Sequence, residues 1–307
     1  MRRTASSLSY PRSSRLWRLE ETLSAYLYVS PALLIFGVFI LLPTLFVFYI
    51  SLFHWNFLNA AHSPYVGLAN YVRLLHSASF WHSLWITLYF VLLTVPSGVL
   101  VSLAIASLLM SNFRGRGFAR LAVFAPYATP LVATTIIWIW IFNPQFGLLN
   151  DLLHLLHLPA LGWLESPRWA MPSVSLYTLW HAIGFNVIIF MAALSNLPSD
   201  LMDAARIDGA GSWQRFWRVV WPLISPTTLF VVVISTIGAM QAFTQFYTMT
   251  GGGPLGATTT TSYLIYEYAF VFYHTGLAAA LTVVYFLLTA LVTLLQFRFS
   301  KGRVFYG

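Results

Sequence analysis

The sequence predicts an all-α, polytopic membrane protein that crosses the membrane with six helices. Hydrophobic residues make up 59% of the 307 residues, whereas charged residues make up only 8%. The mean hydropathy of +0.75 agrees with this composition and excludes an ordinary soluble domain. Six apolar stretches are each long enough for a helix to cross about 30 Å of hydrocarbon, so they are the expected spans.

These spans are expected to form a single membrane domain over residues 26–298. They lie near residues 26–52, 83–110, 119–142, 173–194, 223–247 and 276–298. The first is too long for the apolar region of a signal peptide and lacks a small-residue cleavage site, so we expect it to be retained. A loosely ordered basic tail at 1–25 precedes the domain, and a short tail at 299–307 follows it.

The distribution of Lys and Arg predicts the orientation of these spans. Fourteen of the 16 positive side chains fall in the two tails and around the loops 111–118 and 195–222, and only Arg73 and Arg168 fall in the alternate loops. Positive charge collects on the cytoplasmic side of membrane proteins, so both termini are expected in the cytoplasm. The basic balance therefore reflects topology and does not indicate a nucleic-acid partner.

Two of the outer loops are expected to carry local structure of their own. An apolar stretch at 148–157 predicts a short helix. The run Thr250–Pro254 contains three glycines but lacks the Lys of a phosphate-binding loop, so it predicts a tight connection. Neither loop is long enough for a folded domain of its own.

One polar stretch, Ser199–Pro222, stands out in this apolar chain and is called the charged segment below. It holds six of the chain's 24 charged side chains, and we expect two short helices in it. Ser199 or Asp200 can cap the first helix, and Gly209 can end it in a left-handed conformation. Ser212 can cap a second helix at 212–221, whose aromatic residues share one face: Trp213, Phe216, Trp217 and Trp221. This second helix is expected to lie in the membrane interface, with its aromatic side toward lipid and its Arg side toward headgroups.

Signatures of enzymes and of metal sites are missing from the sequence. The chain has no cysteine, which excludes disulfides and thiolate metal sites. His154 and His157 are spaced to share a metal, but no third ligand accompanies them, so no metal site is predicted. The helix–Gly–helix pattern of the charged segment does not indicate DNA binding, because spans flank it directly on both sides.

The spans contain no charged residue away from their ends, and this bears on the energy source. Carriers driven by protons or sodium ions normally keep a buried charged group on their path. The sequence therefore favours a transporter driven by a separate motor protein that docks on the charged segment. A stand-alone secondary solute carrier is the alternative, and it would move substrate in vesicles that contain this chain alone with an ion gradient.

Polar residues within two spans are the candidates for contact with a transported substrate. Asn186 interrupts the fourth span, close to Trp180 and His181. In the fifth span, the expected stripe on one face of a single helix consists of Gln241, Thr244, Gln245 and Thr248. Such a stripe either lines a polar pathway or donates hydrogen bonds to a neighbouring helix, and the sequence leaves both alternatives open.

The charged segment resembles the cytoplasmic EAA loop of binding-protein-dependent ABC importer permeases. The resemblance rests on Asp203-Ala204-Ala205, Asp208-Gly209-Ala210, Phe216 and Pro222, with Asp203 where the family usually has Glu. Further stretches are similar to the carbohydrate-uptake branch, which includes maltose-type and glycerol-phosphate-type permeases: Leu41-Leu42-Pro43, Val66–Tyr71, Asn143-Pro144 and Thr250–Pro254.

This resemblance implies a type I ABC importer permease fold and a non-catalytic subunit that takes up a sugar or a related polyol or glycerol phosphate. It implies a heterodimer with a second permease, two ATPase subunits and an extracellular or periplasmic substrate-binding protein. ATP and Mg²⁺ would bind at the ATPase, and this chain would bind no cofactor. The residues implied in coupling to the ATPase are Asp203, Ala204, Ala205, Asp208, Gly209 and Ala210.

Overall fold

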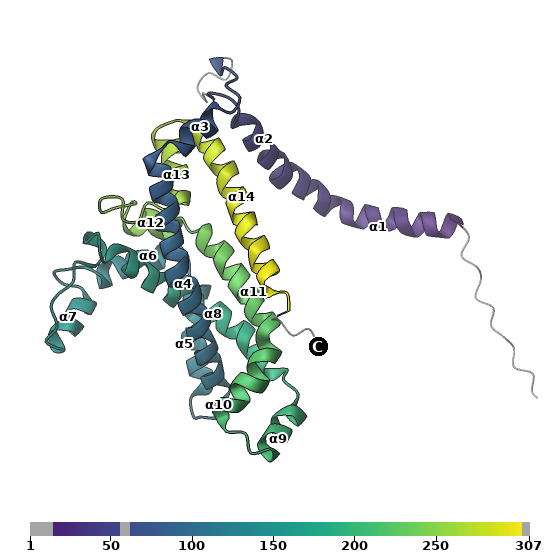
Figure 1. Ribbon diagram of the computed structural model, residues 1–307, viewed down its shortest axis with the longest axis vertical. Helices are drawn as coiled ribbons and strands as arrows, with labels where there is room; N and C mark the ends of the chain where they lie inside the picture. The colour runs from purple at the N-terminus through teal and green to yellow at the C-terminus, as the bar shows by residue number, and fades with distance from the viewer. Residues whose placement is uncertain (1–14, 56–61, 303–307) are drawn as a thin grey trace, which may run out of the picture.

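The computed structural model describes residues 15–55 and 62–302 and confirms the all-α prediction (Figure 1). Within these residues, strand pairing is limited to an isolated bridge between Phe53 and Tyr65. Five helical segments of the described residues are long and apolar enough to cross a membrane: Thr22–Ile50, Ala78–Met110, Ala170–Ser195, Ser212–Met240 and Thr275–Ser300. A bent helix pair supplies a sixth if it counts as one span.

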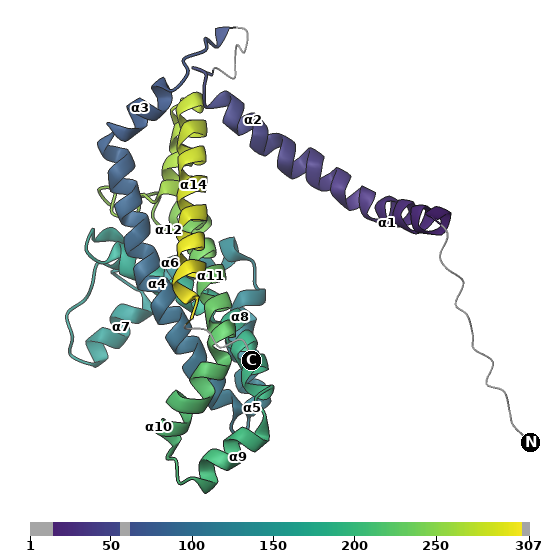
Figure 2. The ribbon, with the colours of Figure 1, turned by 45° about the vertical axis from the view of Figure 1, so that its right-hand side comes forward.

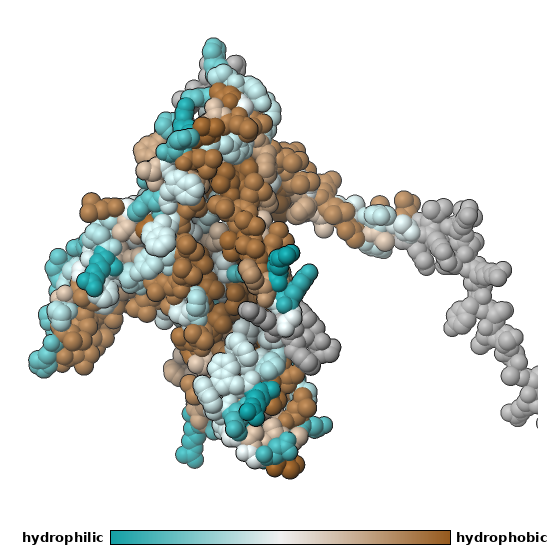
Figure 3. Space-filling view, in the orientation of Figure 1, coloured by the Kyte–Doolittle hydropathy of each residue, from teal (hydrophilic) through white to brown (hydrophobic). Residues whose placement is uncertain are grey.

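The bundle is built mainly from α4 (Ala78–Met110), α8 (Ala170–Ser195), α11 (Trp221–Met240) and α14 (Thr275–Ser300). Helix α4 packs along α8 and also contacts α11. Large apolar side chains such as Phe90, Tyr177 and Phe190 are fully buried between these helices. Figure 3 shows apolar surface along the middle of the bundle and polar surface toward its ends, as a bilayer requires.

The first span does not join this bundle along its length. It runs through α1 (Arg15–Phe36), a π-helical turn (Gly37–Leu41) and α2 (Leu42–Ile50), and it leaves the bundle as an arm (Figures 1 and 2). Near the base of the arm, α2 packs against α14. The described part of the basic tail, residues 15–25, is helical, contrary to the expectation. The rest of that tail, 1–14, lies outside the described residues.

The third expected span, 119–142, is not one straight helix. It consists of α5 (Arg116–Ala128) and α6 (Leu131–Ile141), which meet at an angle of 105°. Thr129 is extended at the junction, with φ −90° and ψ 148°. Pro130 explains the break, because proline provides no backbone N–H and disfavours a helical conformation at the preceding residue.

The fifth expected span, 223–247, also differs from the prediction. Helix α11 ends at Met240, and a separate short helix, α12 (Thr244–Met249), follows. The carbonyl oxygen of Met240 accepts hydrogen bonds from Ser262 Oγ, at 3.0 Å, and from the Tyr285 hydroxyl. Partners from distant parts of the chain thus satisfy a carbonyl that the helix end leaves free.

The second helix of the charged segment is not a separate interfacial helix, which corrects the prediction for 212–221. Helix α10 (Ser212–Arg215) continues through a π-helical turn, Phe216–Val220, directly into α11. The Trp221 N–H donates to the Phe216 carbonyl, and Pro222 follows at once. The turn Gly37–Leu41 has the same arrangement: the Leu42 N–H donates to the Gly37 carbonyl, and Pro43 follows at once. Such local widening allows a helix to continue past a proline.

Short elements close the end of the bundle that lies opposite α9 (Ser199–Ile207) (Figures 1 and 2). They include α3 (Ala69–Leu75), α13 (Thr261–Tyr266) and the π-helical turn Glu267–Val271. The expected helix at 148–157 is present as α7 (Leu148–Leu155). A 3₁₀ turn, Trp163–Glu165, leads toward α8.

The run Thr250–Pro254 forms the tight connection that the sequence predicts. Gly251 and Gly252 both have positive φ, at 55° and 77°. Thr258 closes the loop, because its Oγ1 donates to the Gly253 carbonyl at 2.7 Å and lies 2.7 Å from Thr250 Oγ1.

Candidate functional site

The charged segment forms a helix, a glycine turn and a second helix at one end of the bundle. Helix α9 starts after Pro198 and has no side-chain cap, so neither Ser199 nor Asp200 plays the expected capping role. Ser212 is likewise the first helical residue of α10 and not its cap. Instead, Gln214 Oε1 accepts a hydrogen bond of 3.2 Å from the N–H of Gly211, the residue before α10.

Gly209 ends α9 as the sequence predicts, in a left-handed conformation with φ +76°. Its N–H donates to the Arg206 carbonyl, and the Ala210 N–H donates to the Ala205 carbonyl, both at 3.0 Å. These two bonds define a Schellman motif, which fixes the direction in which the chain leaves a helix. The motif places Ala205 and Ala210, both half-buried, beside each other at the end of α9.

The outer face of α9 combines acidic and apolar side chains. Asp203, Ala204 and Asp208 are exposed, and Ile207 is 87% exposed at the end of the helix. Met202 on the inner side packs against the core cluster that contains Val220 and Ile224. The helix is therefore held to the end of α11 by one face while the other face is open to a partner.

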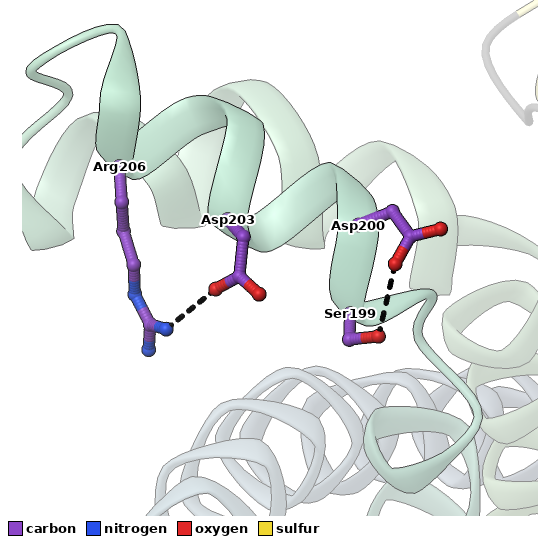
Figure 4. Close-up of polar contacts among 4 residues, drawn as sticks. All are labelled: Ser199, Asp200, Asp203 and Arg206. Atoms are coloured by element: carbon purple, nitrogen blue, oxygen red, sulfur yellow. Dashed lines mark hydrogen bonds and ion pairs between the residues drawn. The ribbon is translucent and has the colours of Figure 1, made fainter.

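Asp203 forms an ion pair along α9, the single such pair within the described part of the chain (Figure 4). Arg206 Nη1 lies 2.7 Å from Asp203 Oδ1, and both side chains are about 60% exposed, at 61% and 60%. An exposed pair of this spacing stabilises a helix by only about 0.2–0.5 kcal/mol. Both groups consequently remain available to a partner that offers stronger interactions.

A cavity of about 510 Å³ lies within the bundle and is the second candidate site. It brings together four of the polar residues singled out in the sequence: Asn186, Gln241, Thr244 and Gln245. The expected single stripe on the fifth span is wrong, because Gln241 follows the end of α11 and the other residues of the stripe lie on α12. The helix break, and not helical periodicity, directs Gln241, Thr244 and Gln245 to one cavity.

Asn186 both contacts a neighbouring helix and lines the cavity. Asn186 is buried, and its Nδ2 donates to Ser235 Oγ of α11 at 3.3 Å. Both residues also line the cavity. His181 lines it as well, whereas Trp180 packs against Trp138 with ring centroids 5.3 Å apart.

Breaks in two helices border the cavity. Tyr127 and Leu131 line it from either side of the α5–α6 break, and Ala239 and Phe243 line it from either side of the α11–α12 break. Broken membrane helices expose backbone groups at mid-membrane and form substrate sites in many transporters. The sequence did not identify Tyr127 or Phe243 as site residues, although Pro130 marks the first break.

Helix α8 holds the α5–α6 break in place. Its Tyr177 hydroxyl donates to the Leu131 carbonyl at 3.1 Å and lies 2.8 Å from Thr134 Oγ1. His181 Nε2 lies 3.4 Å from the Thr129 carbonyl oxygen. The lining of the cavity contains aromatic, amide and hydroxyl groups and no Lys, Arg, Asp or Glu.

A glycine permits the close approach of α5 and α8. A Cβ atom at Gly184 would lie 2.5 Å from the Val123 carbonyl oxygen and 2.9 Å from Phe124 Cα. We expect Gly184→Ala to lower the free energy of unfolding by about 1–3 kcal/mol, because backbone atoms of α5 have to move. Thermal unfolding of the purified protein measures this effect. Gly238→Ala is the matched control, since nothing lies within 4 Å of its Cβ; equal losses in the two variants would contradict the prediction.

Metal binding finds no support in these side chains. Among the described residues, no group of three or more His, Asp or Glu side chains is placed to hold a metal ion. The two sites offer exposed acidic and apolar side chains on α9 and uncharged polar groups in the cavity.

Comparisons with known proteins agree with this arrangement. Residues 98–304 match the family model for the binding-protein-dependent transport system inner membrane component. The chain is 32% identical to the sulfoquinovosyl glycerol transport system permease protein SmoG of Agrobacterium fabrum, over 95% of each chain. It is 32% identical to the trehalose/maltose transport system permease protein MalF of Thermococcus litoralis, over 93% of this chain and 96% of the relative.

Another relative and a solved structure extend this picture. The sn-glycerol-3-phosphate transport system permease protein UgpA of Agrobacterium fabrum is 34% identical over 92% of this chain and 96% of its own. A chain in the crystal structure of a bacterial alginate ABC transporter has the same fold, with a TM-score of 0.80 at 22% identity over 94% of this chain and 98% of its own. The chain therefore belongs to the family of binding-protein-dependent transport system inner membrane components.

Proposed function

We propose that the chain is the permease subunit of an ATP-driven ABC importer that carries a sugar, or a related polyol or glycerol phosphate, into the cytoplasm. The observation that carries the proposal is the combination, in one bundle, of a substrate-sized cavity and a helix–Gly–helix segment at its end. A volume of about 510 Å³ lies within the range of small-molecule sites. According to their names, the relatives above transport sulfoquinovosyl glycerol, trehalose or maltose, and sn-glycerol-3-phosphate.

The charged segment is the proposed docking element for the ATPase. Two ATPase subunits would bind ATP and Mg²⁺ and hydrolyse the nucleotide, one of them seated on α9 of this chain. The Schellman turn at Gly209 would pass the movement of α9 to α10, which is continuous with α11. Because α11 ends at the cavity, closure of the ATPase would change the cavity between outward-facing and inward-facing states.

This role sets the orientation of the chain. The end with α9 would face the cytoplasm, in agreement with the Lys and Arg count, and both termini would lie on that side. The opposite end, which includes α3 and the start of α14, would receive an extracellular or periplasmic binding protein (Figure 2). The alginate transporter described above was crystallised in complex with a periplasmic protein that holds an alginate pentasaccharide, which supports a partner of this kind.

The arm formed by α1 and α2 supports a second permease as partner. Only 6% of the residues in its most apolar stretch are buried within the chain. Leu27, Phe39 and Leu42 are examples of its exposed apolar side chains. In the membrane, the apolar side chains of this arm can contact either lipid or a second subunit. We propose that the arm packs against a second permease in a heterodimer and that lipid surrounds the pair.

Reconstitution tests the function directly. The chain would be placed in proteoliposomes with its partner permease, its ATPase and its binding protein, and uptake of labelled saccharides would be measured. We expect uptake only with ATP and with all four components. Uptake by this chain alone, driven by an ion gradient, would instead establish the secondary carrier.

Gln245 provides a sharper test of the cavity. Its side chain is buried, with 6% exposed, on the short helix α12. We expect Gln245→Leu to lower uptake at low substrate concentration about tenfold, because a lost hydrogen bond to substrate costs about 1.4 kcal/mol. Uptake at substrate concentrations well below saturation measures this effect.

Gln296→Leu is the control for this substitution. Gln296 is also an amide within a span, half-buried on α14. It donates to Thr236 Oγ1 at 2.8 Å and does not line the cavity. Its replacement is expected to leave the uptake rate within about twofold once the protein amounts are matched. Equal losses in both variants would contradict a special role for the cavity.

A further inference from the structure

A small pocket at the end of the bundle opposite α9 gathers groups that donate hydrogen bonds. It has room for about one water-sized atom, at about 20 Å³. Its lining residues are His54, Trp55, Asn70, Arg73, His274, Gly276 and Leu277. No Asp or Glu is among them, and the Arg73 guanidinium forms no ion pair within the described residues.

Trp55 gives the clearest sign of a missing partner. Its indole Nε1 is buried and has no hydrogen-bond partner within the described residues. The ring is packed edge-on against Phe46 and Phe53, with centroids 5.8 and 6.3 Å away. An indole N–H can only donate, and a buried donor without an acceptor costs about 1–3 kcal/mol. Because Trp55 is one of the lining residues, a ligand with an acceptor oxygen is the kind of partner that this donor lacks.

The start of α14 adds further donors to the same pocket. His274 precedes this 26-residue helix, no side chain caps it, and Gly276 and Leu277 lie in its first turn. The first N–H groups of a helix have no intrahelical acceptor, and the helix dipole makes this end attractive to negative charge. Together with Arg73, these groups favour an anion in the pocket.

The walls of the pocket are built by specific contacts. Asn70 Nδ2 donates to the Ser51 carbonyl at 2.8 Å and to the Phe53 carbonyl at 2.9 Å, which fixes the segment that carries Trp55. Gly276 allows the first turn of α14 to approach that segment, because a Cβ atom there would overlap the Phe53 carbonyl oxygen. The donors are therefore held in place by the fold.

We propose that this pocket binds one carboxylate oxygen from an acidic side chain of the external binding protein when that protein docks. The inference rests on the proposed function, which places this end of the bundle on the extracellular or periplasmic side of the membrane. The volume admits a single oxygen atom and excludes a whole sugar or phosphate group. Arg73, His54 and His274 are exposed around it and would meet the rest of the carboxylate. The site would thereby fix the register of the binding protein over the bundle.

The carboxylate preference can be measured with acetate as the probe. The full chain, labelled with ¹⁵N at tryptophan, gives indole N–H resonances, and Trp55→Phe identifies the one from Trp55. We expect acetate, added at constant ionic strength against chloride, to shift this resonance saturably. Arg73→Gln should abolish the saturable shift. A resonance that does not respond to acetate, or that responds equally in Arg73→Gln, would overturn the proposed site.

A second measurement decides where the carboxylate comes from. The affinity of the assembled transporter for its binding protein is compared between the wild type, Arg73→Gln and Arg168→Gln. Arg168 is the matched control, since it is also exposed in an outer loop but lies over the Trp169 ring, 6.0 Å from its centroid. We expect Arg73→Gln to weaken the complex about tenfold and Arg168→Gln to change it less than about twofold.

The outcomes separate this inference from the proposed function. An acetate response without any loss of binding-protein affinity in Arg73→Gln would assign the pocket to free anions and overturn the docking role. Equal losses in the two Arg variants would overturn it as well. A wild-type transporter that binds no binding protein and takes up no saccharide would instead refute the proposed function.

Discussion

Replacing Gly209 with valine is expected to lower ATP-driven uptake by about tenfold or more while the ATPase subunits remain bound. Gly209 adopts φ +76°, where a β-branched residue is strained by about 1–2 kcal/mol. Relief of that strain requires the Schellman turn to open, and α9 then loses its fixed direction relative to α10. The ATPase would still find the surface of α9, but its movement would no longer reach α11. Uptake and ATP hydrolysis, measured on the same proteoliposomes, report this loss of coupling.

Two glycines provide controls for the Gly209 experiment. Gly115 also has positive φ, at 88°, and no atom lies within 4 Å of its Cβ, so Gly115→Val introduces similar strain outside the charged segment. Gly211 has φ −65° and open space around it, so Gly211→Ala adds a side chain to the segment without strain. Both variants are expected to keep uptake coupled to hydrolysis. Normal uptake by Gly209→Val, or an equal loss in Gly115→Val, would contradict the coupling role.

The sequence predicted the structure correctly where that structure depends on neighbouring residues. The end of α9 could be predicted because Asp208-Gly209 carries its own stop signal, and that stop uses hydrogen bonds within a few residues. The spans 170–195 and 275–300 agree with the predicted ones within about three residues, since long apolar stretches specify membrane helices by themselves. The all-α fold of this family follows from the same local rule.

The end of α11 could not be predicted, because its cause lies far along the chain. No proline or glycine occupies 240–243, and apolar periodicity continues through the break. The Met240 carbonyl is held by Ser262 and Tyr285, 22 and 45 residues away. Long-range hydrogen bonds of this kind leave no local pattern in a single sequence.

In the charged segment, the sequence predicted a helix end that the structure does not have. Its aromatic stripe indicated a helix at 212–221 that lies in the membrane interface, separate from the next span. Trp213 and Trp217 do lie along one face and contact each other edge to face, with ring centroids 5.6 Å apart. The π-helical turn at 216–220 lets the same helix pass Pro222, so the stripe lies at the end of a span.

Some residues of the candidate cavity could be predicted from the sequence, and others could not. Asn186 and Gln241 were visible as polar interruptions of apolar stretches, and the cavity contains them. Tyr127 and Phe243 were not visible, because aromatic residues are common in every span of this chain and only tertiary structure selects among them. Polar residues in a span carry information in sequence that aromatic residues do not.

Reversing the charge of Asp203 is expected to release the ATPase. A carboxylate that docks in another protein needs a basic partner there, and Asp203→Lys would place a like charge against it and beside Arg206. We expect recovery of the ATPase on co-purification to fall about tenfold or more, whereas Asp203→Glu keeps it. Asp200→Lys is the matched control one turn earlier on α9, where the carboxylate contacts only Ser199 at 3.3 Å.

A charge swap separates docking from helix stability. In the wild type, Asp203 is already paired with Arg206 at 2.7 Å, so Asp203→Lys also removes an interaction within α9. The double variant Asp203→Arg with Arg206→Asp restores an ion pair of the same spacing, worth about 0.2–0.5 kcal/mol, but presents the opposite polarity to the ATPase. If docking requires a negative charge at position 203, the double variant should still fail to retain the ATPase. Recovery of the ATPase by the double variant would show that the pair acts within α9 alone, because only the internal interaction would have been restored.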